Sequence, residues 1–161
     1  MTIFVANSNS DPFNQALVDA LGDMAQPIPL PYGDALYVGL WENNRGVRVL
    51  IERKRTLDFI QCVLSGRHLK QAQDAANAGY DFQWLIVEGH YSADAGGMVV
   101  LPRQGQWVRL NEIPTPTGHL PDLEFRRLDD YLNQIDLYLG IRHKTEPNLS
   151  LIHISEPTRP Y

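Results

Sequence analysis

A continuous apolar run, Trp84-Leu85-Ile86-Val87, is followed directly by the carboxylate of Glu88. Such a run is typical of a buried strand in the centre of a sheet rather than of a strand with one face in water. Two helical patterns, near 56–65 and 67–78, precede it, and Gly79 is suited to end the second one. A central strand that follows two helices in the chain, together with the strands and helices expected around it, predicts an α/β domain with a mixed sheet.

The other patterns along the chain predict further strands and helices around this run. They rest on apolar residues at strand or helix spacing and on Gly, Pro and Asn between them. In chain order we expect a strand at 2–6, a helix at 12–24, an extended Pro-rich connection at 27–31, strands at 35–41 and 47–51 joined by a hairpin loop at 42–46, a second hairpin at 98–110, a Pro-rich loop at 113–121 and a helix at 122–139 before Gly140.

Length and composition place the chain among ordinary globular proteins. Its 161 residues, 43% hydrophobic and 20% charged, suit one domain with a real core. No apolar run reaches the roughly 18 residues of a membrane span, and no signal peptide is visible, so we expect a cytoplasmic protein without a membrane partner. The single Cys62 excludes an internal disulfide and a cysteine-based zinc site.

Net charge and its distribution bear on nucleic acids. A net charge of −5 argues weakly against a constitutive nucleic-acid coat protein but not against a nuclease, whose metal site is itself acidic. Half of the 14 lysines and arginines lie between residues 45 and 70: Arg45, Arg48, Arg53, Lys54, Arg55, Arg67 and Lys70. They indicate either a nucleic-acid-facing surface or a solvated charged face.

The same region carries a pattern with chemical meaning: Asp34, a long interval, then Glu52 and Lys54. Two carboxylates can hold a divalent cation, and a nearby lysine can handle the attacking water or the charge that develops on a phosphate. In an extended chain Glu52 and Lys54 point to the same face. An all-oxygen site of this kind suits Mg²⁺ or Mn²⁺. Taken alone, however, Glu52 and Lys54 also fit an exposed ion pair at the end of a strand.

The longer pattern resembles the signature of the XPF-type structure-specific endonuclease family, particularly its compact phage and prokaryotic members. Gly33-Asp34, Glu52-Arg53-Lys54 and Asp58 match GDxₙERKxxxD in order, and Gly66-Arg67 with Gln71 matches GRxxxQ. Residues 85–88 are similar to the third core strand of the family, which ends in Glu. The resemblance covers about residues 3 to 145.

The resemblance implies a restriction-endonuclease-like (PD-(D/E)XK) core, a mixed sheet flanked by helices, here with an extra hairpin near 98–110. It implies a DNA endonuclease that uses Mg²⁺ or Mn²⁺, acts on branched or flap DNA and could form a homodimer. By position, the catalytic residues would be Asp34, Glu52 and Lys54, the metal ligands Asp34, Glu52 and Glu88, and the DNA-binding or supporting residues Arg53, Asp58, Arg67 and Gln71.

Alternatives remain for several of these residues and for the activity. Asp58 also fits a carboxylate that stabilises a helix start, and Arg67 also fits a local cap. The first strand lacks the family's Asp-x-Arg-Glu element; Asn7 or Asp11 could replace its acid, although Asp11 also fits a helix cap. A catalytically weakened or inactive DNA-binding scaffold is therefore the main alternative, while GRxxxQ disfavours a junction resolvase. The tryptophans are interpreted as packing residues rather than base-stacking platforms: Trp41, Trp84 and Trp107.

Residues 149–159 resemble the in-frame translation of a sequencing-library adapter. We therefore expect a nuclease domain at 1–148, a non-native segment at 149–161, and a natural chain that continues past about residue 148. A tandem helix-hairpin-helix module is not visible in the sequence.

Overall fold

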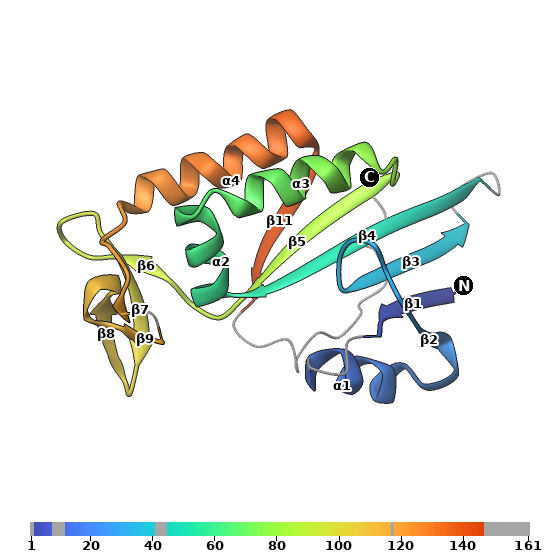
Figure 1. Cartoon of the computed structure of the whole chain (residues 1–161), viewed down its shortest axis with the longest axis horizontal. Coiled ribbons are helices and arrows are strands. Elements are labelled where there is room, and N and C mark those ends of the chain that lie inside the picture. The colour runs from blue at the N-terminus through green and yellow to red at the C-terminus, as the bar shows by residue number, and fades with distance from the viewer. Residues whose placement is uncertain (1, 8–11, 41–44, 117, 147–161) are drawn as a thin grey trace, which may run out of the picture.

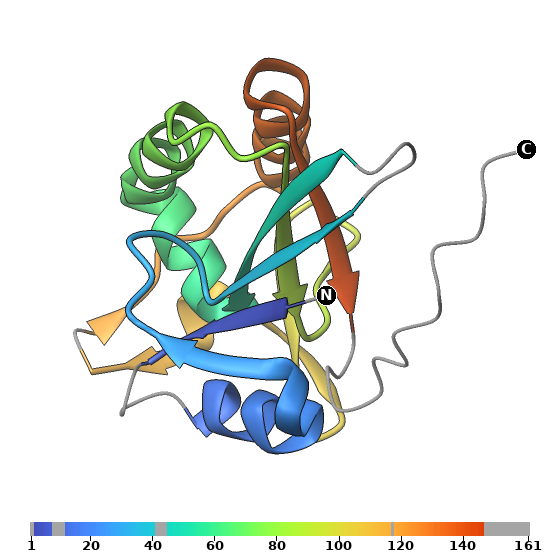
Figure 2. The same ribbon diagram turned by 90° about the vertical axis from the view of Figure 1, so that its right-hand side faces the viewer.

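The computed structural model describes residues 2–7, 12–40, 45–116 and 118–146. Its centre is a six-stranded sheet in the order β11-β5-β4-β3-β1-β2. Helices α2, α3 and α4 cover one face of this sheet, and α1 lies on the other side against β1 and β2 (Figures 1 and 2). The bounds are β1 Thr2–Ala6, α1 Pro12–Leu21, η1 Gly22–Met24, β2 Ala25–Ile28, β3 Ala35–Leu40, β4 Gly46–Arg55, α2 Thr56–Leu64, α3 Arg67–Asn77, β5 Phe82–Glu88, β6 Ser92–Ala93, β7 Val99–Arg103, β8 Gln106–Arg109, η3 Leu110–Glu112, β9 Pro114–Thr115, β10 Gly118–His119, α4 Phe125–Leu139 and β11 Ile141–Glu146.

The sheet is mixed because a hairpin is joined to strands that run parallel. β3 and β4 pair antiparallel, with Ala35 opposite Ile51, and β4 then runs parallel to β5, with Glu52 beside Leu85. β5 lies between β4 and β11, so the apolar run that it contains is central, as predicted. The expected α/β mixed sheet flanked by helices is confirmed.

The main hydrophobic core lies between the sheet and helices α2, α3 and α4. Alternate residues of β5 face it, and Leu85 and Val87 are each only 1% exposed. The helices contribute Phe59 and Ile60 from α2 and Leu128 from α4, which are fully buried. This core fixes the position of β4 and β5, whose carboxyl ends carry the charged motif residues.

A second, smaller sheet lies beside the carboxyl ends of β4 and β5. Its three strands have the order β6-β7-β8, and β7 and β8 form the hairpin expected near 98–110 (Figure 1). Leu101 of β7 belongs to the main core, and Val108 of β8 packs against that core. The small sheet is therefore attached to the domain through one of its faces.

Two strands of the six-stranded sheet were not expected. Residues 25–28, which follow the expected helix and include the start of the expected Pro-rich connection, form β2, which pairs parallel with β1 at the edge of the sheet. Residues 141–146 form β11, which pairs parallel with β5. An edge strand can accept Pro27, because one side of its backbone needs no sheet partner.

Several expectations concern residues that the structure does not describe: the cap at Asp11, the loop at 42–44, the side-chain environment of Trp41 and the segment 149–161. Within the described ranges, no helix combines the length and the apolar character needed to cross a membrane.

Candidate active site

Asp34 is fixed against β4 from two directions. Its backbone N–H donates to the carbonyl oxygen of Ile51 at 2.8 Å, and its carboxylate Oδ2 accepts from the backbone N–H of Arg53 at 2.7 Å. These two partners are the chain neighbours of Glu52. The carboxylate of Asp34 is therefore held beside Glu52 by the antiparallel register of β3 and β4.

The tight turn before Asp34 depends on Gly33. Its φ is +70°, a conformation that glycine adopts without strain. A Cβ at this position would lie 2.7 Å from Leu50 Cδ1 and 2.9 Å from the Ile51 carbonyl oxygen. The glycine of the Gly-Asp pair therefore lets the chain approach β4 closely enough for Asp34 to form both hydrogen bonds.

Glu52 and Lys54 lie on the same face of β4, as their spacing predicted. Lys54 Nζ donates to Glu52 Oε1 at 2.5 Å, and their side chains are 13% and 33% exposed, respectively. Burial lowers the pKa of Lys54, but the nearby charges of Glu52 and Asp34 and the hydrogen bond to Glu52 outweigh it, so the pKa is raised. Lys54 is thus held as an ammonium beside two carboxylates.

Arg53 points to the opposite face of β4 and pairs there with Glu88. The Arg53 guanidinium donates to Glu88 Oε2, and the two side chains are 8% and 21% exposed. The structure therefore brings Asp34, Glu52 and Lys54 together but places Glu88 with Arg53. The expected role of Glu88 as a metal ligand stays a prediction.

Gln71 approaches Glu52 from α3, whereas Glu52 and Lys54 belong to strand β4. It lines a hollow of about 180 Å³ together with Gly33 and Glu52. The hollow lies where α3 crosses the sheet, and the buried Gln83 braces that crossing by donating from Nε2 to the Ala75 carbonyl oxygen at 2.9 Å. The glutamine of the GRxxxQ segment therefore faces the same hollow as Gly33 and Glu52 of the first motif, and its role there stays a prediction.

The remaining predicted residues lie on the surface nearby. Asp58 is exposed in the first turn of α2, which fits a carboxylate favoured by the helix dipole as well as a supporting role. Arg67 begins α3, is exposed, and donates from Nε to Ser65 Oγ at 3.2 Å. Asn7 follows β1 and is exposed, with its backbone N–H donating to Ile28.

The basic residues between 45 and 70 divide into separate groups rather than one surface. Arg45 and Arg48 pair with Asp81 at the opposite end of β4. Arg53 and Lys54 are paired at the site. Exposed basic side chains remain near the carboxyl end of β4 and at the start of α3: Arg55, Arg67 and Lys70.

The donor set suits a hard divalent cation with few protein ligands. Among the described residues, no three His, Cys, Asp or Glu side chains converge on one point that could hold a metal. Mg²⁺ is commonly bound by only one or two carboxylates, with water and substrate phosphate completing its shell. Asp34 and Glu52 provide such a pair of oxygen donors.

The geometry of this site can be compared with known proteins. A model of the ERCC4 domain matches residues 13–98, which include Asp34, Glu52, Lys54 and Gln71. The chain belongs to the ERCC4 domain family. No curated protein sequence matches it.

The ERCC4 fold is also seen in solved structures. XPF from Aeropyrum pernix has a TM-score of 0.56 and 21% sequence identity, over 92% of this chain and 57% of that one. XPF from Aeropyrum pernix in complex with DNA has a TM-score of 0.54 and 21% identity, over 91% of this chain and 56% of that one. The chain thus spans little more than half the length of these proteins. The restriction-endonuclease-like fold and the XPF-type family expected from the motifs are confirmed.

One surface residue of this ERCC4 domain was misjudged from the sequence. Trp107 was interpreted as a packing residue, but its side chain is 55% exposed on β8. Trp84 is half-buried, with the Arg142 guanidinium 5.8 Å from the centre of its ring. Alternation of apolar and polar residues cannot predict which face of this short hairpin is exposed, because both of its faces carry apolar residues.

Proposed function

We propose that this ERCC4 domain is a DNA endonuclease that hydrolyses phosphodiester bonds with the help of Mg²⁺ or Mn²⁺. The observation that carries the proposal is the position of Asp34, whose carboxylate is fixed by Arg53 N–H beside Glu52. Two carboxylates and a lysine, brought together from the start of β3 and the end of β4, are the chemical groups that metal-assisted phosphodiester hydrolysis needs. The family match to the ERCC4 domain supports the same reaction class.

Asp34 and Glu52 would hold the cation, with the Arg53 carbonyl as a further oxygen within the same strand segment. When bound, the cation would act as a Lewis acid on the phosphate and lower the pKa of a bound water. Lys54 would keep its positive charge at the site and donate a hydrogen bond to a phosphate oxygen or to the attacking water. Its bond to Glu52 supports this role, because it holds the ammonium beside one of the proposed metal ligands.

Gln71, Arg67 and Arg55 would contact the DNA around the scissile phosphate. Gln71 lines the same hollow as Glu52, and the two arginines are exposed at the end of β4 and the start of α3. Branched or flap DNA is the proposed substrate class, because the family resemblance is to structure-specific endonucleases. The DNA complex of the similar XPF supports DNA as a partner.

A second candidate is a DNA-binding scaffold with weak or no cleavage. The pairing of Glu88 with Arg53 favours it, since a third carboxylate is then engaged away from Asp34 and Glu52. The intact Asp34, Glu52 and Lys54 favour the enzyme, because a scaffold has no need of a lysine bonded to one carboxylate and close enough to feel the charge of a second.

Cleavage of labelled flap, fork and linear duplex DNA with Mg²⁺ or Mn²⁺ tests the proposal. The wild-type protein should cut, whereas Asp34→Ala and Lys54→Ala should not. Asp74→Asn is the control, because Asp74 is an exposed aspartate on α3. DNA binding without cutting by wild type would favour the scaffold, and equal cutting by Asp34→Ala would overturn the site assignment.

A further inference from the structure

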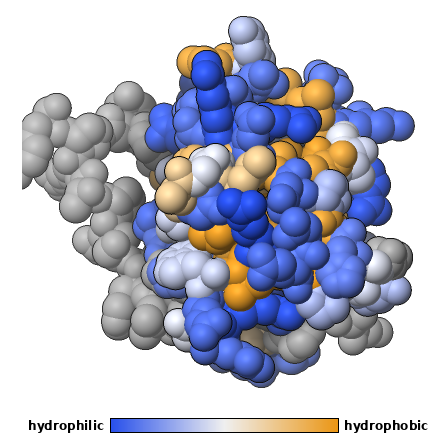
Figure 3. Space-filling model, turned by 90° about the vertical axis from the view of Figure 1, so that its left-hand side faces the viewer, coloured by the Kyte–Doolittle hydropathy of each residue, from blue (hydrophilic) through white to orange (hydrophobic). Residues whose placement is uncertain are grey.

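The small sheet presents an aromatic and a guanidinium side chain to solvent on one face. Trp107 and Arg109 are two residues apart on β8 and therefore point to the same side. Trp107 is 55% exposed and the Arg109 side chain is 42% exposed. Both line a hollow of about 410 Å³, whose floor includes the buried Val100. Figure 3 faces the end of the molecule where the small sheet lies and shows a mainly hydrophilic surface with apolar residues near its centre.

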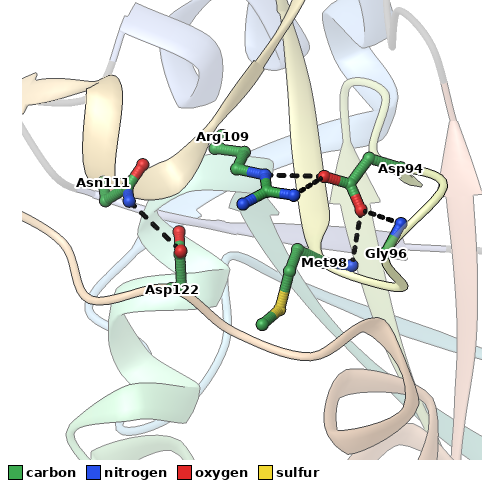
Figure 4. Close-up of polar contacts among 6 residues, drawn as sticks. All are labelled: Asp94, Gly96, Met98, Arg109, Asn111 and Asp122. Carbon is green, nitrogen blue, oxygen red and sulfur yellow. Dashed lines mark hydrogen bonds and ion pairs between the residues drawn. The ribbon is translucent and has the colours of Figure 1, made fainter.

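Asp94 ties together one wall of the hollow. Asp94 accepts hydrogen bonds from the backbone N–H groups of Gly96 and Met98 through Oδ1, at 2.8 and 3.0 Å. Its other oxygen accepts from Arg109 Nε at 2.6 Å (Figure 4). The guanidinium is therefore held in place before any ligand arrives, which lowers the entropy lost on binding.

The charges of the hollow select the kind of ligand. Its charged lining consists of Arg109, Asp94 and Glu112, so that acidic groups outnumber the one arginine. A phosphate would be repelled by Glu112, but a neutral flat group with N–H donors would suit the site. Such a group could stack on the indole or the guanidinium and donate to the Glu112 carboxylate. A nucleobase has all of these properties.

The hairpin lies next to the carboxyl end of β5, the strand beside the one that carries Glu52 and Lys54. Trp107 pairs with Pro102 across the hairpin. Pro102 and Arg103 line another hollow, of about 240 Å³, together with Glu88 and His90 at the carboxyl end of β5. A DNA strand that passes the carboxyl end of β5 on this side would lie close to Arg103 and Trp107.

We propose that the face of β8 formed by Trp107 and Arg109 is a stacking site for an unpaired nucleobase of the DNA substrate. The inference rests on the proposed function for the presence of DNA and adds where unpaired bases are recognised. Fully paired duplex has its bases stacked inside the helix and would not use the site. The surface would thus contribute to the preference for branched over linear DNA.

Binding of labelled DNA by the full chain in EDTA, followed by fluorescence anisotropy, tests this proposal without cleavage. Two probes of equal length are compared, a single-stranded flap substrate and a fully paired duplex. Trp107→Ala should weaken flap binding by about 5- to 150-fold, the range for loss of one stacked base, and leave duplex binding unchanged. Trp107→Tyr, which keeps a ring, should retain most of the flap affinity.

Tyr138→Ala is the matched control, because Tyr138 is an exposed aromatic residue on α4, 81% accessible, and should bind both probes like wild type. Equal affinity of Trp107→Ala and wild type for flap DNA would overturn the proposal. So would a loss of duplex affinity in Trp107→Ala as large as its loss of flap affinity. A wild type that binds flaps through Trp107 but does not cut with Mg²⁺ or Mn²⁺ would refute the nuclease and leave the stacking site standing. If the wild type cuts and Trp107→Ala binds flap DNA like wild type, the nuclease proposal stands and the stacking site is refuted.

Discussion

Replacing Arg53 by methionine should strongly destabilise the fold, independently of any catalytic role. Its guanidinium pairs with Glu88, and the two side chains are only 8% and 21% exposed. The pair is therefore not screened like a surface ion pair. Removal of one partner from a buried pair costs roughly 3–5 kcal/mol, and since Glu88 keeps some contact with solvent, the lower end of about 3 kcal/mol is expected. For a domain of this size that corresponds to a fall of roughly 6–12 °C in Tm.

Urea unfolding of four proteins measures the effect: wild type, Arg53→Met, Glu88→Leu and the double variant. The double variant should lose less free energy of unfolding than the two single losses added together, because it leaves no uncompensated charge. Lys144→Met is the control, since Lys144 is 64% exposed in its pair with Glu146 and its replacement should change stability by less than about 0.5 kcal/mol. Arg53→Met that behaves like Lys144→Met, or additive losses in the double variant, would refute the reasoning.

Three further outcomes follow from the geometry. Gly33→Ala should lower the free energy of unfolding by about 1–3 kcal/mol through strain and overpacking, because its Cβ would meet Leu50 and the Ile51 carbonyl. Gly22→Ala, with open space at its Cβ, is the control and should lower the free energy of unfolding by less. Urea unfolding measures both. Hydrogen bonds from the backbone of Met98, together with those from Arg109 and Gly96, outweigh burial and lower the pKa of Asp94. The ionised Asp94 therefore stabilises the fold at pH values above the usual carboxyl pKa, and this contribution is lost as the pH falls through its lowered pKa in the folded state. Asp94→Asn should accordingly be less stable than wild type at neutral pH. Thermal melts of the two proteins should converge in acid. Mn²⁺ at about 100 times its Kd should stabilise the wild type by about 2.7 kcal/mol, and the same titration of Asp34→Asn should show a smaller shift in Tm.

The sequence predicted the central elements of this fold because their patterns are local. The apolar run at 84–87, the β3–β4 hairpin and the helix before Gly140 each follow from residues close together in the chain. β11 was not predicted because Arg142 to Glu146 is mostly polar, and its strand conformation comes from pairing with β5. β4 also runs four residues beyond its expected end, through Arg55, because β5 continues to pair with it.

The candidate site was predictable in its sheet residues and less so in its partners. Alternation along β4 correctly put Glu52 and Lys54 on one face, and the register of the hairpin brought Asp34 to them. The pairing of Glu88 with Arg53 depends on the parallel register of β4 and β5, which alternation within one strand does not contain. The exposure of Trp107 depends in the same way on how a separate small sheet packs against the core.

The central claim is that the Asp34 carboxylate, through its charge, serves metal-dependent DNA cleavage. Asp34→Asn tests it most directly, because an asparagine oxygen can still accept the hydrogen bond from Arg53 N–H, while the charge is lost. Single-turnover cleavage of flap DNA in Mg²⁺ should fall by about 100-fold or more, since loss of a metal ligand removes several kcal/mol of transition-state stabilisation. Its Tm without metal should stay close to that of wild type. Cleavage by Asp34→Asn at the wild-type rate would contradict the claim.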